Sequence, residues 1–366
     1  MIRVRRAITI LGICGLALSC TTSADNTSQA EEKWRESVQN INPDFEEIFR
    51  IARHADSSHN VQPWKVLLES ENSIVVAVEA SRRLPEVDPE NREILLSIGG
   101  FIEMTLQAAE ALGYETDVVM LADSSSKSTI ARIIFRKTDA KRNQYKINTL
   151  CSVYTEKKSL SSESMSTDVL ESLQDIAAPD RTHLLRFYEP DSPETKWVRE
   201  EAPKAAVEQA LRDPVQRELV DLMHFSKTAS REKRIGMTPE MMGLSGIARF
   251  FWYSFFTPET MMKESNRKTI GSIVEKQLDN SAGILVITSD AGRPADLIET
   301  GRIYQRLKVA AIKKNIIIHP ISQLLEEKRW KARTPGKLGG GKPVQYITRI
   351  GYRKGKPLDL EADAVT

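Results

Sequence analysis

The sequence predicts a protein of mixed helices and strands in which one strand-and-helix unit occurs twice. In the first unit, residues 73–78 are rich in the β-branched side chains that favour strands, and residues 88–112 place their apolar side chains on one helical face. The second unit consists of an apolar segment at 283–288 and a long amphipathic segment at 295–315. The units agree in pattern rather than in identities, which indicates a weak internal duplication.

The other helices and strands are predicted from the same periodicities and from residues that are typical of helix and strand ends. Asp88 and Pro89 are typical of a helix start, and Gly113 is typical of the residue after a helix end. Pro203 predicts a kink or break in the helix expected at 196–211. Further helices are expected at 45–52, 167–178 and 218–225, and further strands at 64–68, 118–121, 130–135, 183–188 and 345–352.

Length and composition indicate a folded body without a nucleic-acid partner. The chain has 366 residues, and its 40% hydrophobic content is ample for a core. The formal charge of +2 includes Arg3, Arg5 and Arg6, which lie in a segment expected to be removed. Taking these three from 52 basic residues leaves 49 against 50 acidic residues. A nearly neutral protein lacks the excess of positive charge that is typical of nucleic-acid-binding proteins.

The N-terminus predicts export from the cytoplasm. Basic residues precede a short apolar run at 7–18, which is shorter than the ~20 residues that span a bilayer, so residues 1–20 are expected to be a signal peptide. Residues 16–20 resemble a bacterial lipobox, which implies that Cys20 is lipidated, and Arg5-Arg6 resembles a twin-arginine signal. The polar residues 21–41 are expected to form a flexible tether. We therefore expect a periplasmic or cell-envelope lipoprotein.

Neither a disulfide framework nor a metal site is expected. Cys14 and Cys20 lie in the leader, which leaves Cys151 in the body, and a lone cysteine is more often a packed apolar residue than a reactive thiol. His54 and His59 have no acidic or cysteine partner at a ligand-like spacing.

The densest polar stretch lies at 55–64, between an expected helix and an expected strand. Its hydroxyls and carboxamides can donate to and accept from a planar heterocycle such as a flavin. The alternative is an ordinary loop, in which the same residue types bond to their own backbone.

Several segments resemble the FMN-dependent nitroreductase family. Residues 57–64 (Ser-Ser-His-Asn-Val-Gln-Pro-Trp) resemble its signature P-S-S-x-N-x-Q-P-W, with Asp56 where proline is usual. Residues 88–114 resemble a segment of the Acg-type branch, in which two modules are fused. Residues 147–160 resemble the opening that this branch repeats, although Val153 and Lys157 or Lys158 stand near the places of its arginines. More diffuse similarities occur at 231–237, 283–315 and 345–352.

The resemblance implies an α+β, nitroreductase-like fold with two fused modules that form an intramolecular pseudo-dimer. The modules would span 42–148 and 149–355, followed by a tail at 356–366, with one FMN in the seam between them. Residues implied to contact the ring or the ribityl chain are Ser57, Ser58, Asn60 and Gln62. Gly236 would offer a backbone N–H near the flavin N5. Candidates for the phosphate are Arg53, Arg329 and Arg333, because a dianion needs paired donors.

Three functions are compatible with this resemblance. The first is an FMN-dependent oxidoreductase that reduces an electron-poor nitroaromatic or quinone-like molecule. The second is a non-catalytic exported lipoprotein that binds or sequesters free flavin, and the third is a cofactor-free descendant that binds another planar molecule. The expected partners are a small molecule and, through the lipid anchor, a membrane; the expected assembly is a monomer.

An aromatic segment at 247–256 (Ile-Ala-Arg-Phe-Phe-Trp-Tyr-Ser-Phe-Phe) admits several interpretations. Such clusters are more often core than ligand-binding. The segment could also be a lid over a flavin or a surface that rests on a membrane.

Overall fold

The computed structural model describes residues 7–8, 42–122, 128–155, 157, 160–179, 182–355, 358 and 360. The predictions for Cys20 and for the tether at 21–41 therefore lie outside the described residues, as do those for nearly all of the signal peptide and the tail. The two-residue strand β1 (Ala7–Ile8) pairs antiparallel with residues of the first sheet.

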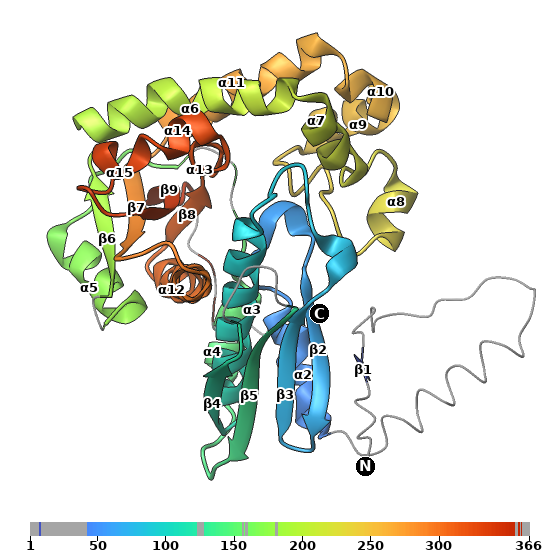
Figure 1. Ribbon diagram of the computed structural model, residues 1–366, viewed down its shortest axis with the longest axis vertical. Coiled ribbons are helices and arrows are strands. Elements are labelled where there is room, and N and C mark those ends of the chain that lie inside the picture. The colour runs from blue at the N-terminus through green and yellow to red at the C-terminus, as the bar shows by residue number, and fades with distance from the viewer. Residues whose placement is uncertain are drawn as a thin grey trace, which may run out of the picture.

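Two antiparallel sheets with the same connectivity form the frame of the molecule (Figure 1). The first has the order β1-β2-β3-β5-β4, and the second has the order β6-β7-β9-β8. The strands of the first sheet are β2 (Trp64–Ser70), β3 (Ser73–Val78), β4 (Tyr114–Met120) and β5 (Thr129–Lys137). Those of the second are β6 (His183–Tyr188), β7 (Gly283–Ser289), β8 (Ile316–Pro320) and β9 (Val344–Tyr352). Leaving β1 aside, each sheet places its first, second, fourth and third strands side by side.

One long helix joins the second and third strands of each sheet. These helices are α3 (Arg92–Ala111) and α12 (Pro294–Ile312), and they pack on each other between the two sheets (Figure 1). Their contact is reciprocal. A Cβ on Gly99 would lie 2.0 Å from the carbonyl oxygen of Ile298, and a Cβ on Gly301 would lie 2.0 Å from that of Leu96. The backbones meet so closely that only glycine fits at either position.

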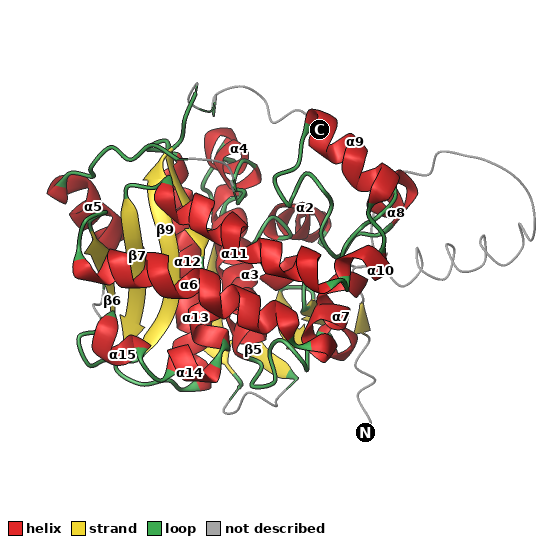
Figure 2. Ribbon diagram, turned by 90° about the horizontal axis from the view of Figure 1, so that it is seen from above, coloured by secondary structure: helices red, strands yellow, loops and turns green. Residues whose placement is uncertain are grey.

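The second half contains a large helical insertion between β6 and β7. Its helices are α6 (Pro193–Leu211), α7 (Asp213–Asp221), α8 (Lys227–Glu232), α9 (Gly246–Phe255), α10 (Pro258–Met261) and α11 (Glu264–Asp279). Figure 2 shows α6 and α11 lying across the second sheet, while α8 and α9 lie at the opposite edge of the molecule from β6. The insertion therefore reaches from the second half toward the first.

Separate apolar clusters fill the two halves. In the first, side chains of α2 (Pro43–Ala52), α3 and α4 (Gln144–Cys151) pack against the sheet. In the second, α5 (Thr167–Ala177) and α12 contribute to one cluster, while α6 and α11 contribute to another. Three short helices complete the chain: α13 (Gln323–Glu326), α14 (Lys328–Lys331) and α15 (Thr334–Lys337).

The α+β class and most of the predicted elements are confirmed. The predicted start of α3 at Asp88 is wrong, because the helix begins at Arg92. Asp88 instead caps it from outside, accepting hydrogen bonds from the backbone N–H of Arg92 at 2.7 Å and of Ile94 at 3.0 Å. The helix predicted at 218–225 lies earlier, as α7. The α6 helix runs on through Pro203.

Among the described helices, α3 is long and apolar enough to cross a membrane by length and composition. It is also 83% buried inside the protein, as expected of a central core helix. The β2–β5 strands fall within the predicted first module and the β6–β9 strands within the second. The exact module boundaries stay a prediction.

Candidate functional site

The polar loop at residues 55–63 connects α2 to β2 and has an unusual backbone. His59, Asn60 and Gln62 adopt positive φ angles of 48°, 56° and 48°. Asparagine and histidine adopt this left-handed conformation more often than most residues do, but glutamine rarely adopts it. Each such residue costs roughly 1–3 kcal/mol and persists only where its surroundings enforce it. A loop that merely joined two elements would not need this geometry.

Asn60 and Gln62 contact the helical insertion. The Asn60 carboxamide donates to the carbonyl oxygen of Gly236 at 2.8 Å, and that of Gln62 donates to the carbonyl oxygen of Arg234 at 2.7 Å. In return, the Gly236 N–H donates to the Asn60 carbonyl oxygen at 3.1 Å. Gly236 has a φ of 94°, and a Cβ there would lie 2.3 Å from the Leu222 carbonyl oxygen. The structure thus brings together three of the predicted site residues, Asn60, Gln62 and Gly236.

The two serines tie the loop to itself and to α3. The Ser57 hydroxyl accepts the backbone N–H of Gln62 at 3.0 Å, which closes the loop. The backbone N–H of Ser58 donates to the Ser97 hydroxyl on α3 at 3.2 Å. Both serines are half-buried beside Asn60 and Gln62.

Asp56 connects the loop to the second half. Its carboxylate accepts from the Lys308 ammonium at 2.5 Å, the Tyr304 hydroxyl at 3.1 Å and the Thr155 hydroxyl at 3.1 Å. Lys308 is buried, so this ion pair is largely shielded from solvent. The residue that departs from the family signature is therefore paired with α12.

A buried hydrogen-bonded pair, Arg92 and Glu93, lies at the start of α3. The Arg92 guanidinium donates to the Glu93 carboxylate at 2.5 Å and to the carbonyl oxygen of Gln345 on β9. Burial raises the pKa of Glu93 to about 8, against the lowering effect of Arg92 and with further raising by Glu326 and Asp88. Burial also raises the pKa of Asp88 to about 6. At neutral pH, Glu93 is therefore mostly a neutral hydrogen-bonding group.

Two buried polar atoms near the loop have no hydrogen-bond partner within the described part of the chain. One is Nε2 of Gln305, whose Oε1 lies 3.5 Å from the backbone nitrogen of Asp56. The other is Oε1 of Glu326, whose Oε2 accepts from Gln209 at 2.5 Å. The charge of Glu326 acts on both His59 and Glu93. One unused donor and one unused acceptor therefore lie close to the loop.

The three arginines predicted for a phosphate occupy other surroundings. Arg53 is exposed at the end of α2. The Arg333 guanidinium pairs with Glu201 at 3.3 Å and lies over the Trp197 ring, while that of Arg329 lies over the Trp330 ring. No contact found among the described residues joins Arg329 or Arg333 to the polar loop. Their assignment stays a prediction.

Residues of the second half near the loop were not selected from the sequence. Lys308 bonds to Asp56, and Lys157 affects the pKa of His59, which burial lowers. Burial likewise lowers the pKa of Lys157, and the charge of Asp56 opposes that effect. The resemblance at 147–160 was a usable signal for Thr155 and Lys157, but Lys308 lies in a helix predicted only as amphipathic.

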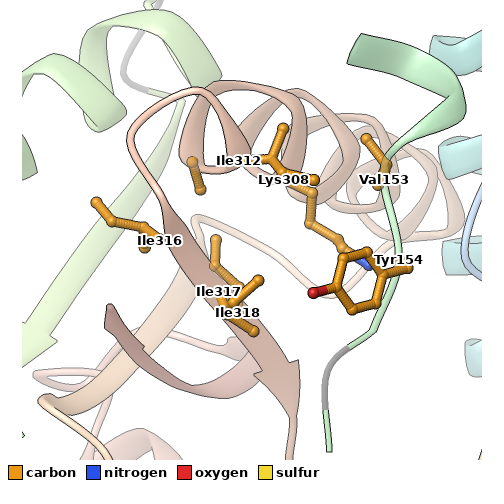
Figure 3. A pocket seen from close by; sticks show the side chains of 8 residues that line it. Val153, Tyr154, Lys308, Ile312, Ile316, Ile317 and Ile318 are labelled. Atoms are coloured by element: carbon orange, nitrogen blue, oxygen red, sulfur yellow. The ribbon is translucent and has the colours of Figure 1, made fainter. Parts of the chain in front are cut away.

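A small cavity lies behind this cluster, between the end of α12 and β8 (Figure 3). Its volume is about 10 Å³, room for about one water molecule. Figure 3 shows the Lys308 side chain reaching toward Tyr154 along one wall. The rest of the lining is apolar and includes Val153, Ile312 and Ile317. This cavity is far too small for a flavin.

Comparisons with known proteins give a distant structural likeness. No family model matches the chain, and no curated protein matches it. A crystal structure provisionally described as a nitroreductase from Anabaena variabilis is 13% identical, with a TM-score of 0.41, covering 77% of this chain and 69% of its own. The FMN-dependent nitroreductase NfnB from Mycobacterium smegmatis, solved with NADPH, is 11% identical, with a TM-score of 0.33, covering 58% of this chain and 88% of its own. Both TM-scores are below 0.5, so a functional assignment has to rest on the residues of this chain.

Proposed function

We propose that this protein is an FMN-binding oxidoreductase of the nitroreductase type, which reduces an electron-poor nitroaromatic or quinone-like molecule. The observation that supports it is the contact of Asn60 and Gln62 with the loop at 234–236. Both segments were selected from the sequence as flavin-contacting, although they lie far apart in the chain. Their meeting at a strained loop is what a shared ligand site requires.

The donor and acceptor set fits a flavin ring. An isoalloxazine edge alternates acceptors with one N–H donor. The loop offers two hydroxyls and those carboxamide atoms of Asn60 and Gln62 that do not bond to the carbonyl oxygens of Gly236 and Arg234. The unpartnered Nε2 of Gln305 supplies a further donor, and the unpartnered Oε1 of Glu326 supplies an acceptor. The residues that would hold FMN are therefore Ser57, Ser58, Asn60 and Gln62, with a backbone N–H from Gly236.

The phosphate would need cations, and two groups of candidates exist. Arg53, Arg329 and Arg333 are the arginines selected from the sequence. Lys157 and Lys308 lie closer to the polar loop, by the interactions of Lys308 with Asp56 and of Lys157 with His59. A doubly charged group favours a site with at least two of these side chains.

The charges around the loop suit a redox cofactor. Bound FMN would supply hydride transfer, while the protein positions and tunes it. A free carboxylate at Asp56 would oppose negative charge on a reduced ring, but Lys308 and two hydroxyls neutralise and solvate it. Protonated Glu93 adds no negative charge at neutral pH.

We also propose that the two halves act as an intramolecular pseudo-dimer with a single site. Their equal strand order and the reciprocal contact of Gly99 and Gly301 support this proposal. The remaining parts rest on the sequence alone: a monomer, exported as a periplasmic or cell-envelope lipoprotein and anchored through Cys20.

A non-catalytic role in binding or sequestering free flavin is the second candidate. It is favoured by the engagement of both loop carboxamides with backbone carbonyls and by Val153, which stands where the related opening has an arginine. Such a protein would retain flavin without passing electrons on.

The visible absorption spectrum of the purified protein tests both candidates. We expect a yellow protein that releases FMN on denaturation and whose reduced form is reoxidised by a nitroaromatic or a quinone. Flavin that no acceptor reoxidises would favour sequestration. A colourless protein that also fails to bind added FMN would refute both.

A double substitution tests the site itself. Ser57→Ala with Asn60→Ala should weaken FMN retention about tenfold or more, because one ligand hydrogen bond is worth about 1 kcal/mol. The matched control is Ser70→Ala with Asn72→Ala, the same residue types at the end of β2 and in the turn that follows it. Equal FMN affinities for the two variants would mean that residues 57–62 form only a loop.

A further inference from the structure

The α9 helix presents an apolar face to solvent. Ile247, Phe250, Phe251 and Phe255 are 76%, 65%, 49% and 62% exposed. Other large hydrophobic side chains that are exposed in the described structure are scattered over several elements, and none exceeds 49%. Single exposed hydrophobics are normal on a protein surface, but four on one short helix form a patch that needs an explanation.

The opposite face of α9 is firmly held. Trp252 is buried, its indole N–H donates to the His224 carbonyl oxygen at 2.9 Å, and its ring stacks between those of Phe225 and Phe256. The Tyr253 hydroxyl lies 3.0 Å from that of Ser230 on α8. These contacts fix the orientation of α9 about its own axis, so its four exposed apolar side chains are held facing the solvent.

The segment that carries this patch is basic. Residues 226–256 contain five basic side chains, Lys227, Arg231, Lys233, Arg234 and Arg249, and two acidic ones, Glu232 and Glu240. All seven are exposed. Glu240 pairs with Arg249 at 2.9 Å. This surplus contrasts with the near neutrality of the chain as a whole.

We propose that α8 and α9 form a docking surface for an anionic lipid bilayer. Exposed aromatic side chains on a segment rich in lysine and arginine are typical of interfacial helices, whose apolar face enters the headgroup boundary while the cations contact anionic lipids. Docking of a second copy through the same face would bring two basic surfaces together, which like charges oppose. The proposal is independent of the cofactor and of the reaction.

Membrane docking would orient the molecule. The same insertion supplies the loop at 234–236 that contacts Asn60 and Gln62, and the Met241 sulfur lies 3.7 Å from the Asn60 carboxamide. The proposed docking surface therefore lies on the same segment as residues 234–236, which cover the polar loop.

Quenching by brominated lipids tests the orientation in the full chain. The single-tryptophan additions Phe250→Trp and Ile176→Trp place a probe on α9 and on α5, at positions that are 65% and 49% exposed. With vesicles of phosphatidylcholine and phosphatidylglycerol brominated in their acyl chains, we expect the added fluorescence of Phe250→Trp to be quenched at least threefold more strongly. A membrane-inserted N-terminus alone would not separate these two positions. Equal quenching would overturn the proposal.

The charge requirement has its own control. Removing phosphatidylglycerol should reduce the quenching of Phe250→Trp severalfold, and quenching that ignores lipid charge would refute the anionic surface. The triple variant Ile247→Ser, Phe250→Ser, Phe255→Ser changes only exposed side chains, and circular dichroism checks that it folds. If sedimentation showed a dimer that this variant abolishes, the face would belong to a second copy instead of a bilayer.

Discussion

The two halves of the molecule share a strand order but differ in how their first two strands are joined. In the first half, residues 71–72 form a tight turn between β2 and β3. In the second half, residues 189–282 separate β6 from β7, yet these strands pair in the same antiparallel way. A sheet tolerates such a long insertion because the entropy cost of closing a loop grows slowly with its length.

This difference distributes the parts of the candidate site between the halves. The first half supplies the strained loop before β2, and the insertion of the second half covers it through Arg234 and Gly236. The residues before β6, 178–182 (Ala-Pro-Asp-Arg-Thr), contain no serine, asparagine or glutamine. Duplication of a frame thus need not duplicate a site, because one copy can keep the polar loop while the other acquires its cover.

The largest expected effect comes from the place where the halves are equivalent. Gly99→Ala and Gly301→Ala should each destabilise the protein by about 4 kcal/mol, because each new Cβ would lie 2.0 Å from a backbone oxygen that cannot move alone. Urea unfolding measures the loss. Similar losses of stability in the two variants would support a symmetric crossing of α3 and α12, in which Gly99 and Gly301 are equivalent.

A neighbouring glycine provides the control. A Cβ on Gly100 would meet atoms no closer than 3.7 Å, and alanine is the better helix former, so Gly100→Ala should be neutral or stabilising by up to about 1 kcal/mol. If Gly99→Ala proved as mild as Gly100→Ala, the helices would not be in contact as described.

A smaller expected effect is a pH dependence of the protein's stability that arises from the first half and not from the equivalent position in the second. Glu93 has a pKa raised to about 8, whereas alanine occupies the comparable position, 295, when α12 is aligned on α3 through Gly99 and Gly301. Between pH 6.5 and 8 the folded state holds the Glu93 proton and the unfolded state does not, so stability falls as pH rises, by about 2 kcal/mol. His54, His59 and His319, whose pKa values burial lowers, act in the opposite direction, mainly below pH 6.5.

Unfolding measured across this pH range tests the assignment. Glu93→Gln keeps a neutral group of similar shape and should flatten the slope. Ala295→Glu introduces an acid at the aligned position of α12, which is exposed, and should leave the slope unchanged. An unchanged slope in Glu93→Gln would assign the pH dependence to other groups.

Much of the frame could be predicted because its signals are local. The buried strands β3 and β7 are continuous apolar runs, and α3 and α12 have long apolar faces, so their existence and type follow from periodicity. The polar loop could also be selected, because five hydrogen-bonding side chains in a short segment are visible without a structure.

The site could be predicted only in part, because its other members are brought together by tertiary packing. Lys308 lies in an amphipathic helix, where nothing local distinguishes it from a surface lysine, yet it is buried against Asp56. Arg329 and Arg333 were chosen for their charge, and the contacts of Arg333 are with α6. The start of α3 was misplaced because Asp88 caps from a turn that precedes the helix.

The smallest expected effect tests the contact between the polar loop and residues 234–236 of the insertion. Asn60→Asp keeps the side-chain shape and tolerates the left-handed backbone, but it replaces the donor to the Gly236 carbonyl with an acceptor. Loss of about 1 kcal/mol of local stability should speed hydrogen exchange at the Gly236 amide about fivefold or more. The control Asn72→Asp, in the short turn of the same half, should leave this amide unchanged. Unchanged exchange in Asn60→Asp would mean that the polar loop does not hold residues 234–236 in place. The insertion would then be held by its own contacts, such as the β-bridge between Met223 and Met237.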